Sequence, residues 1–172
     1  VALAPDATAP QPCVTSVAEN GLPDDPDARR CRDDMAEASE LLRMVAADQL
    51  DLAWEAVCAT SDLWEVLYYE ALLRAAGQDP GGPAPTGAIE ALERLGLVRV
   101  LDVHDVAKVL DQLEADPSIV LAANISARSA ILDHWWLAIE RRLRSRGDLA
   151  RRLVIEIKET AEISASHAKG FA

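Results

Sequence analysis

Short continuous runs of apolar residues indicate three buried strands. The first run, 63–69, is rich in aromatic and aliphatic residues. The second, 118–126, is the clearest buried strand in the chain, and the third covers residues 152–157. A fourth segment, 50–57, alternates apolar and polar residues, and turn-like residues 59–62 separate it from the first run. We therefore predict a hairpin that leads into the strand 63–69.

Apolar residues spaced three and four positions apart predict helices between these strands. The predicted helices cover residues 28–48, 88–95, 97–113 and 132–143, and a final helix begins near residue 160. Thr86 is expected to cap the second helix and Gly96 to end it. A loop dense in Gly and Pro, 77–87, precedes that helix. It follows directly after a strand, which is where a barrel places its functional loops.

Strands that alternate with helices after an opening hairpin predict an α/β fold with a mostly parallel sheet wrapped by helices. A complete (β/α) barrel needs about 250 residues, and this chain supplies about four strands, roughly half of a TIM-barrel-like fold. The exposed strand edge of a half barrel is a liability in water. We therefore expect a domain that is truncated at its C-terminus, or completed by another chain as in a homodimer.

The N-terminal segment has a different character from the rest. Residues 1–27 are rich in Pro, Ala and Asp and have no sustained period, so we interpret them as a linker or disordered arm. The barrel domain is then 28–172. Its first helix, 28–48, is either a joint to an upstream regulatory domain, half of a dimer contact, or a helix packed on its own barrel. We favour the last of these.

Composition restricts the class of protein. The chain has 172 residues, half of them hydrophobic, with a net charge of -12 and a pI near 4.6. This suits one soluble domain and argues against a nucleic-acid polymer as partner, because phosphate backbones require clustered Lys and Arg. Three cysteines without a CxxC spacing favour a reducing cytoplasm. No apolar run reaches the roughly 18 residues of a transmembrane helix, so we expect no membrane contact from this segment.

Polar residues stand where the three predicted buried strands end. Glu70 follows the first run, Asn124 lies near the end of the second, and Glu156 near the end of the third. The carboxyl ends of parallel barrel strands face one common site, and carboxylate and amide oxygens suit Mg²⁺, Mn²⁺ or Ca²⁺. Two alternatives remain. Glu70 forms a structural ion pair with Arg74, or the strand-end residues only satisfy backbone groups.

Three motifs in this order resemble the EAL domain family. Residues 69–74 read Tyr-Glu-Ala-Leu-Leu-Arg, which resembles the family's signature. Residues 123–126 resemble its Asn-Leu-Ser strand end, and 156–159 resemble its Glu-x-x-Glu. The resemblance implies a barrel that binds cyclic diguanylate (c-di-GMP). It also implies a metal-dependent phosphodiesterase that hydrolyses c-di-GMP to linear pGpG in bacterial second-messenger signalling.

The same resemblance assigns roles to individual residues. It implies that the metal ligands are Glu70, Asn124 and Glu156, that the catalytic residues are Glu70 and Glu159, and that the substrate-binding residues are Leu73, Arg74 and Glu55. Within this set Arg74 would hold a phosphate and Glu159 would steady the loop over the site. The implied cofactor is Mg²⁺ or Mn²⁺, with Ca²⁺ as a non-activating substitute. The alternative is a degenerate domain that acts as a non-catalytic c-di-GMP receptor or protein-interaction module.

The sequence also departs from the family. Glu55 and Ala56 stand where the family has Gln-Pro, and an extra carboxylate near a phosphate site would repel the ligand. Ala88 replaces an aromatic residue that would wall the guanine site. The pair of Asp residues that should end the next strand is not in this sequence. Because two-metal hydrolysis requires ligands on both metals, we expect hydrolysis only from the full domain.

Overall fold

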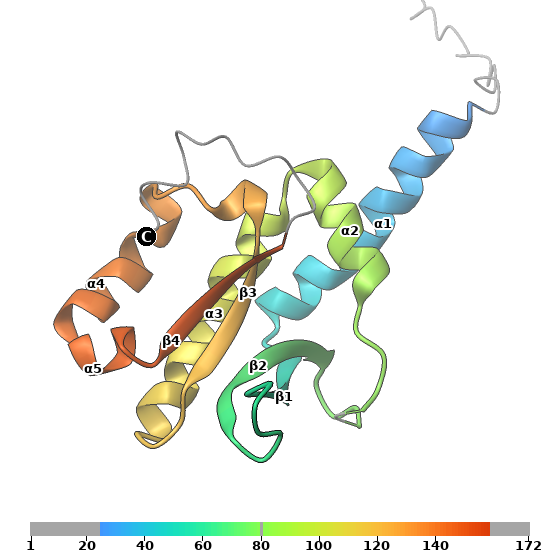
Figure 1. Ribbon diagram of the computed structural model, residues 1–172. Coiled ribbons are helices and arrows are strands. Elements are labelled where there is room, and N and C mark those ends of the chain that lie inside the picture. The colour runs from blue at the N-terminus through green and yellow to red at the C-terminus, as the bar shows by residue number, and fades with distance from the viewer. Residues whose placement is uncertain (1–24, 80, 159–172) are drawn as a thin grey trace, which may run out of the picture.

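The computed structural model describes residues 25–79 and 81–158 (Figure 1). In chain order the helices and strands are α1 (Pro26–Ala46), β1 (Leu50–Cys58), β2 (Val66–Ala75), α2 (Thr86–Leu95), α3 (Val98–Ala115), β3 (Leu121–Ser126), α4 (Leu137–Ser145), α5 (Gly147–Ala150) and β4 (Leu153–Lys158). Short 3-10 turns, η1 (Ala127–Ser129) and η2 (His134–Trp136), connect β3 to α4. The predicted N-terminal arm, apart from its last three residues, and the predicted final helix lie outside the described residues.

The strands form one sheet in the order β1-β2-β3-β4. β1 and β2 are an antiparallel hairpin, whereas β2, β3 and β4 run parallel. The ladder between β2 and β3 is short, because only Tyr69 and Glu70 pair with Leu121 and Ala122. The predicted α/β fold with an antiparallel first strand is therefore confirmed. β2 and β3 are joined at one end of the sheet only.

The boundaries of β2 differ from the prediction. The apolar run 63–69 contains the hairpin turn, in which the side chains of Leu63 and Trp64 are 76% and 93% exposed. β2 continues to Ala75, which pairs with Leu50, so Glu70 lies in the middle of the strand and not at its end. Pairing with the long strand β1 sets the boundaries here, because each backbone group of β2 gains a hydrogen-bond partner along it.

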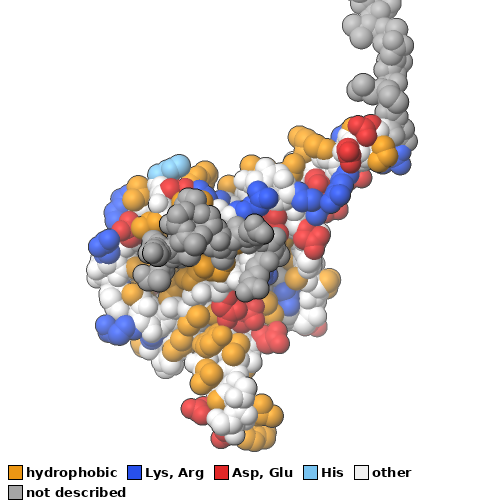
Figure 2. Space-filling model, turned by 45° about the horizontal axis from the view of Figure 1, so that its top comes forward, with side chains coloured by type: hydrophobic (Ala, Val, Ile, Leu, Met, Phe, Trp, Pro, Cys, Tyr) orange, Lys and Arg blue, Asp and Glu red, His pale blue; other side chains and the backbone are white. Residues whose placement is uncertain are grey.

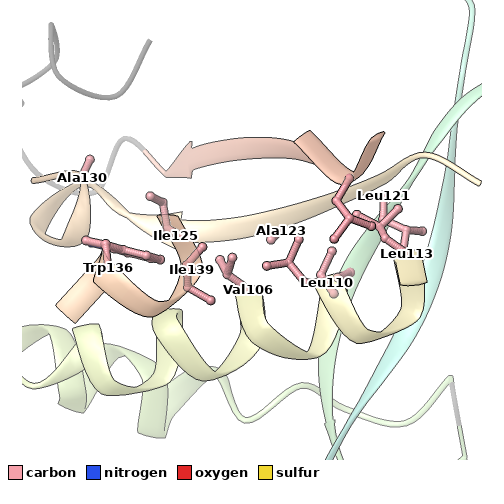
Figure 3. Close-up of a cluster of buried hydrophobic side chains, with 12 residues drawn as sticks. Val106, Leu110, Leu113, Leu121, Ala123, Ile125, Ala130, Trp136 and Ile139 are labelled. Atoms are coloured by element: carbon pink, nitrogen blue, oxygen red, sulfur yellow. The ribbon is translucent and has the colours of Figure 1, made fainter. Parts of the chain in front are cut away.

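The main core lies between α3 and one face of β3. Figure 3 shows Val106 and Leu110 of α3 directed toward Ala123 and Ile125 of β3. Trp136 closes one end of this cluster, and its indole nitrogen donates a hydrogen bond to a backbone carbonyl at 2.9 Å. A spacing of three and four residues on α3 and of two on β3 brings these side chains to one plane. This packing fixes the position of β3 against the helix layer.

A second cluster joins α1 and α2 to the hairpin. Leu41 of α1, Leu73 of β2 and Leu92 of α2 are all buried in it. Asp34 of α1 and Arg94 of α2 form an ion pair at 2.7 Å. The interpretation of the first helix as one that packs on its own domain is therefore supported. Gly96 (φ 72°) ends α2 as expected, but Pro85 occupies the N-cap position, so the prediction that Thr86 caps this helix was wrong.

Candidate functional site

Strand register places four of the predicted site residues on one face of the sheet. Glu55 lies directly opposite Glu70 across the hairpin, and Asn124 lies directly opposite Glu156 on β3 and β4. Residues paired in this way project from the same face. The opposite face, with Ile125, packs on α3. The polar face therefore gathers residues from all four strands.

Glu70 and Asn124 are in direct contact. The Asn124 side-chain nitrogen Nδ2 donates a hydrogen bond to Glu70 Oε1 at 2.6 Å and a longer one to the Ala71 carbonyl at 3.3 Å. A carboxylate oxygen only accepts hydrogen bonds, so the amide nitrogen and not the amide oxygen faces Glu70. The structure thus brings together two residues that are 54 positions apart and that the sequence had assigned to one site.

Tyr68 joins this face, although the sequence analysis did not single it out. It precedes Glu70 by two residues in β2, and residues two apart in a strand share a face. A hydrogen bond to Glu156 and burial both raise the pKa of the Tyr68 phenol. The spacing of two from Glu70 is a signal that could have identified it. Glu156 is therefore held by a phenol from β2, two strands away.

A divalent cation at Glu70 and Asn124 requires the Asn124 oxygen, whereas here the amide nitrogen is directed at Glu70. Glu70 faces a nitrogen donor, and Glu156 accepts a hydrogen bond from Tyr68. Among residues 25–79 and 81–158, no group of three or more His, Cys, Asp or Glu side chains is placed to hold a metal ion. A cation that binds here must displace the Asn124 nitrogen, which requires the amide to turn its oxygen inward.

Arg74 and Asn124 line the same cavity, which has a volume of about 270 Å³. Leu73, Ser126 and Lys158 also line it. The cavity lies where β2 and β3 separate beyond their short ladder, and the first half of α3 forms its other side. The Arg74 guanidinium donates a hydrogen bond to the Leu73 carbonyl at 2.8 Å. A cation and an amide from adjacent strands thus converge on one concave site.

The remaining predicted site residues have different environments. Leu73 is only 7% exposed and belongs to the cluster beneath β2, although it also lines the cavity. Glu55 is exposed, and its position opposite Glu70 places two like charges side by side, which is unfavourable in a sheet. Glu159 lies outside the described residues. Figure 2 shows acidic side chains gathered on one face, above the apolar tip at the bottom of the view.

A buried carboxylate from α3 holds the end of β3. Asp102 is 5% exposed, and its Oδ2 accepts a hydrogen bond from the Ser126 backbone nitrogen at 3.1 Å. Burial raises the pKa of Asp102 to about 7, although the adjacent Ser129 hydroxyl and the Ser126 N–H lower it. Asp102 also lines the cavity, and the Ser126 backbone that it holds lies two residues beyond Asn124 on β3. No local pattern identifies it, because its role depends on how α3 packs against β3.

Asp102 makes stability depend on pH. Its pKa is about 7 in the folded protein, against an ordinary value of 3.8. Between these values the folded protein retains a proton that the unfolded chain has lost, so stability falls as pH rises from about 4 to about 7. In Asp102→Asn we expect a higher melting temperature than wild type at pH 8 and a shallower decline across this range. Thermal melts at several pH values test this, and parallel pH profiles would contradict it.

Comparisons with known proteins agree with this geometry. The family model described as EAL domain matches residues 38–169. The structure is similar to LapD S helix-GGDEF-EAL of Vibrio cholerae bound to c-di-GMP, with a TM-score of 0.65 at 19% identity, covering 80% of this chain and 34% of that one. It is also similar to the Xanthomonas citri FimX EAL domain in complex with c-di-GMP, with a TM-score of 0.60 at 20% identity and coverages of 84% and 55%.

A third similar structure is an EAL domain protein of Listeria monocytogenes EGD-e, with a TM-score of 0.57 at 17% identity and coverages of 78% and 53%. At these identities the likeness concerns the fold. The chain spans between a third and just over half of the length of these structures. A search of curated proteins found no match. Within the described part of the chain, none of the helices has the length and apolar character needed to cross a bilayer.

Proposed function

Because the chain belongs to the EAL domain family, we propose that it binds c-di-GMP at the cavity beside the ends of its parallel strands. One observation carries this proposal. Arg74 of β2 and Asn124 of β3 line a single cavity, although 50 positions separate them. Two of the similar structures contain bound c-di-GMP. The same ligand suits a site that offers a guanidinium and an amide.

The contribution of each residue follows from its chemistry. The Arg74 guanidinium presents a planar fork of donors that matches two phosphate oxygens. The Asn124 amide is held in place by Glu70 at 2.6 Å, so it costs little entropy to order it on binding. Asp102 fixes the backbone at Ser126 from the helix side. We infer a preformed half-site, to which further residues of the full-length protein add.

Our first proposal is a receptor that binds c-di-GMP and leaves it intact. Two hydrogen bonds favour it: the Asn124 side-chain nitrogen donates to Glu70, and the Tyr68 phenol donates to Glu156. Both carboxylates therefore already accept a hydrogen bond from a protein side chain. The second candidate is the phosphodiesterase, which converts c-di-GMP to linear pGpG with Mg²⁺ or Mn²⁺. The presence of Glu70, Asn124 and Glu156 on one face favours that activity.

Chromatography of the nucleotide separates these two functions. The full-length protein is incubated with c-di-GMP and either MnCl₂ or MgCl₂, and the recovered nucleotide is resolved from a linear pGpG standard. We expect intact c-di-GMP at all times. Linear product that depends on added metal, and that Glu70→Gln abolishes, would overturn the receptor proposal and establish the enzyme.

A further inference from the structure

Lys158 occupies a position that the sequence analysis did not consider. It is the last residue of β4 and pairs in register with Ser126 of β3. It follows Glu156 by two residues, so its side chain leaves the strand on the polar face. Lys158 is exposed. The register thus places a mobile ammonium at the same edge of the sheet as Asn124.

Lys158 and Arg74 line the same cavity from opposite sides. Arg74 belongs to β2, Lys158 belongs to β4, and Asn124 of the intervening strand β3 lies between them. The two cations therefore flank the amide on either side. A cyclic dinucleotide carries two phosphodiester groups, each with one negative charge. Arg74 and Lys158 belong to the two strands on either side of β3, so the cavity offers two separate positive charges for two phosphodiesters.

Among the described residues, four acidic ones line this cavity: Glu90, Glu93, Asp102 and Asp105. Glu90 pairs with Arg94 at 3.6 Å. Asp102 accepts the Ser126 N–H, and Asp105 lies 3.1 Å from the His104 ring nitrogen. Burial raises the pKa of Asp105, while the nearby His104, Lys108 and Lys158 lower it. The hydrogen bonds and burial of Asp102 and Asp105 limit their repulsion of an anion. The Lys158 ammonium also lies close enough to Asp105 to interact with it electrostatically.

We propose that Lys158 is a phosphate-binding residue that works with Arg74 to hold the two phosphodiesters of the dinucleotide. This inference rests on the proposed function and adds Lys158 to Arg74 as a second positively charged residue of the binding site. Because Lys158 supplies positive charge at the strand ends, binding needs no divalent metal there. The lysine is a flexible point charge, whereas Arg74 is a planar fork, so Arg74 fixes orientation and Lys158 neutralises charge.

Isothermal titration of the full-length protein with c-di-GMP tests this role. In Lys158→Ala we expect affinity to fall roughly tenfold, the effect of losing one charged hydrogen bond of about 1.4 kcal/mol. Lys158→Arg retains the charge and should bind within about twofold of wild type. The dependence of affinity on salt should be weaker in Lys158→Ala than in wild type. Wild-type affinity should be the same in EDTA and in MnCl₂.

Lys108→Ala is the matched control, because this half-buried lysine in the interior of α3 pairs with Asp48 at 2.8 Å and does not line the cavity. Thermal melts verify that each variant is folded. Unchanged affinity in Lys158→Ala, with a wild type that binds, would overturn the role of Lys158 and leave the proposed function standing. Loss of wild-type binding in EDTA would overturn the claim that binding needs no divalent metal. A wild type that binds under neither condition would overturn the proposed function itself.

Discussion

Replacing Arg74 with alanine is expected to weaken c-di-GMP binding by roughly 10- to 100-fold. A hydrogen bond to a charged group contributes about 1.5–3 kcal/mol, and each 1.4 kcal/mol corresponds to a tenfold change in the dissociation constant. The guanidinium lines the cavity together with Asn124 and Lys158, and a charged group of this kind donates strong hydrogen bonds to a phosphodiester. Isothermal titration of the folded variant measures the change directly.

Arg144→Ala is the matched control for this experiment. Arg144 lies on α4, is 77% exposed and pairs with Glu140 at 2.7 Å, so it carries the same charge away from the cavity. Its removal should leave the affinity within about twofold of wild type, because exposed ion pairs contribute little. Equal affinities of Arg74→Ala and wild type would remove Arg74 from the site. Equal losses of affinity in both variants would show that the effect comes from the change in net charge and not from a contact between Arg74 and the ligand.

Replacing Leu110 with alanine is expected to lower the free energy of unfolding by about 3 kcal/mol. Leu110 is fully buried between α3 and β3, where it packs in the cluster with Leu121 and Ala123 (Figure 3). Truncation removes apolar contacts and leaves a cavity. β3, on the other side of this cavity, is hydrogen-bonded to both β2 and β4, which limits how far it can move to fill the space. Urea unfolding followed by circular dichroism measures the change.

Leu137→Ala controls for the loss of leucine itself. Leu137 begins α4 and is 43% exposed, so its truncation should cost less than about 1 kcal/mol. A Leu110→Ala variant that is as stable as wild type would contradict the packing described for α3 against β3. Since this packing positions Asn124, we also expect Leu110→Ala to show weaker ligand binding in proportion to its unfolded fraction.

Local pattern was sufficient for the order and type of the strands and of helices α1 to α4, but not for α5 or the two 3-10 turns. Continuous apolar runs predicted β3 and β4, and the alternation in 50–57 predicted β1 and its hairpin. The run 63–69 misled because its apolar residues include an exposed turn, with Trp64 at 93% exposure. Strand length there is set by pairing with β1 and not by hydrophobicity. The alternation of residue types indicates that a segment is a strand, but it does not indicate how long the strand is that pairs with it.

The candidate site was predictable where it depends on strand period alone. The contact between Glu70 and Asn124 follows from their positions on one face of two adjacent parallel strands, although Glu70 lies in the middle of β2. Tyr68 and Lys158 lie two residues from Glu70 and Glu156, so the same period could have identified them. Asp102 was not predictable, because it reaches Ser126 through the tertiary packing of α3.

The orientation of the Asn124 amide also lies beyond sequence reasoning. The motifs predicted an oxygen ligand for a metal, whereas the structure presents the nitrogen to Glu70. The nitrogen faces the carboxylate because the packing of β2 against β3 brings the amide to Glu70, whose oxygens only accept hydrogen bonds, at 2.6 Å.

The most direct test of the account is an isothermal titration of the full-length protein with c-di-GMP in the presence of EDTA. We predict saturable binding that is strongly weakened in Arg74→Ala and moderately weakened in Lys158→Ala. The absence of a binding isotherm in wild type, with the protein shown to be folded by its thermal melt, would contradict the assignment of this cavity to the dinucleotide.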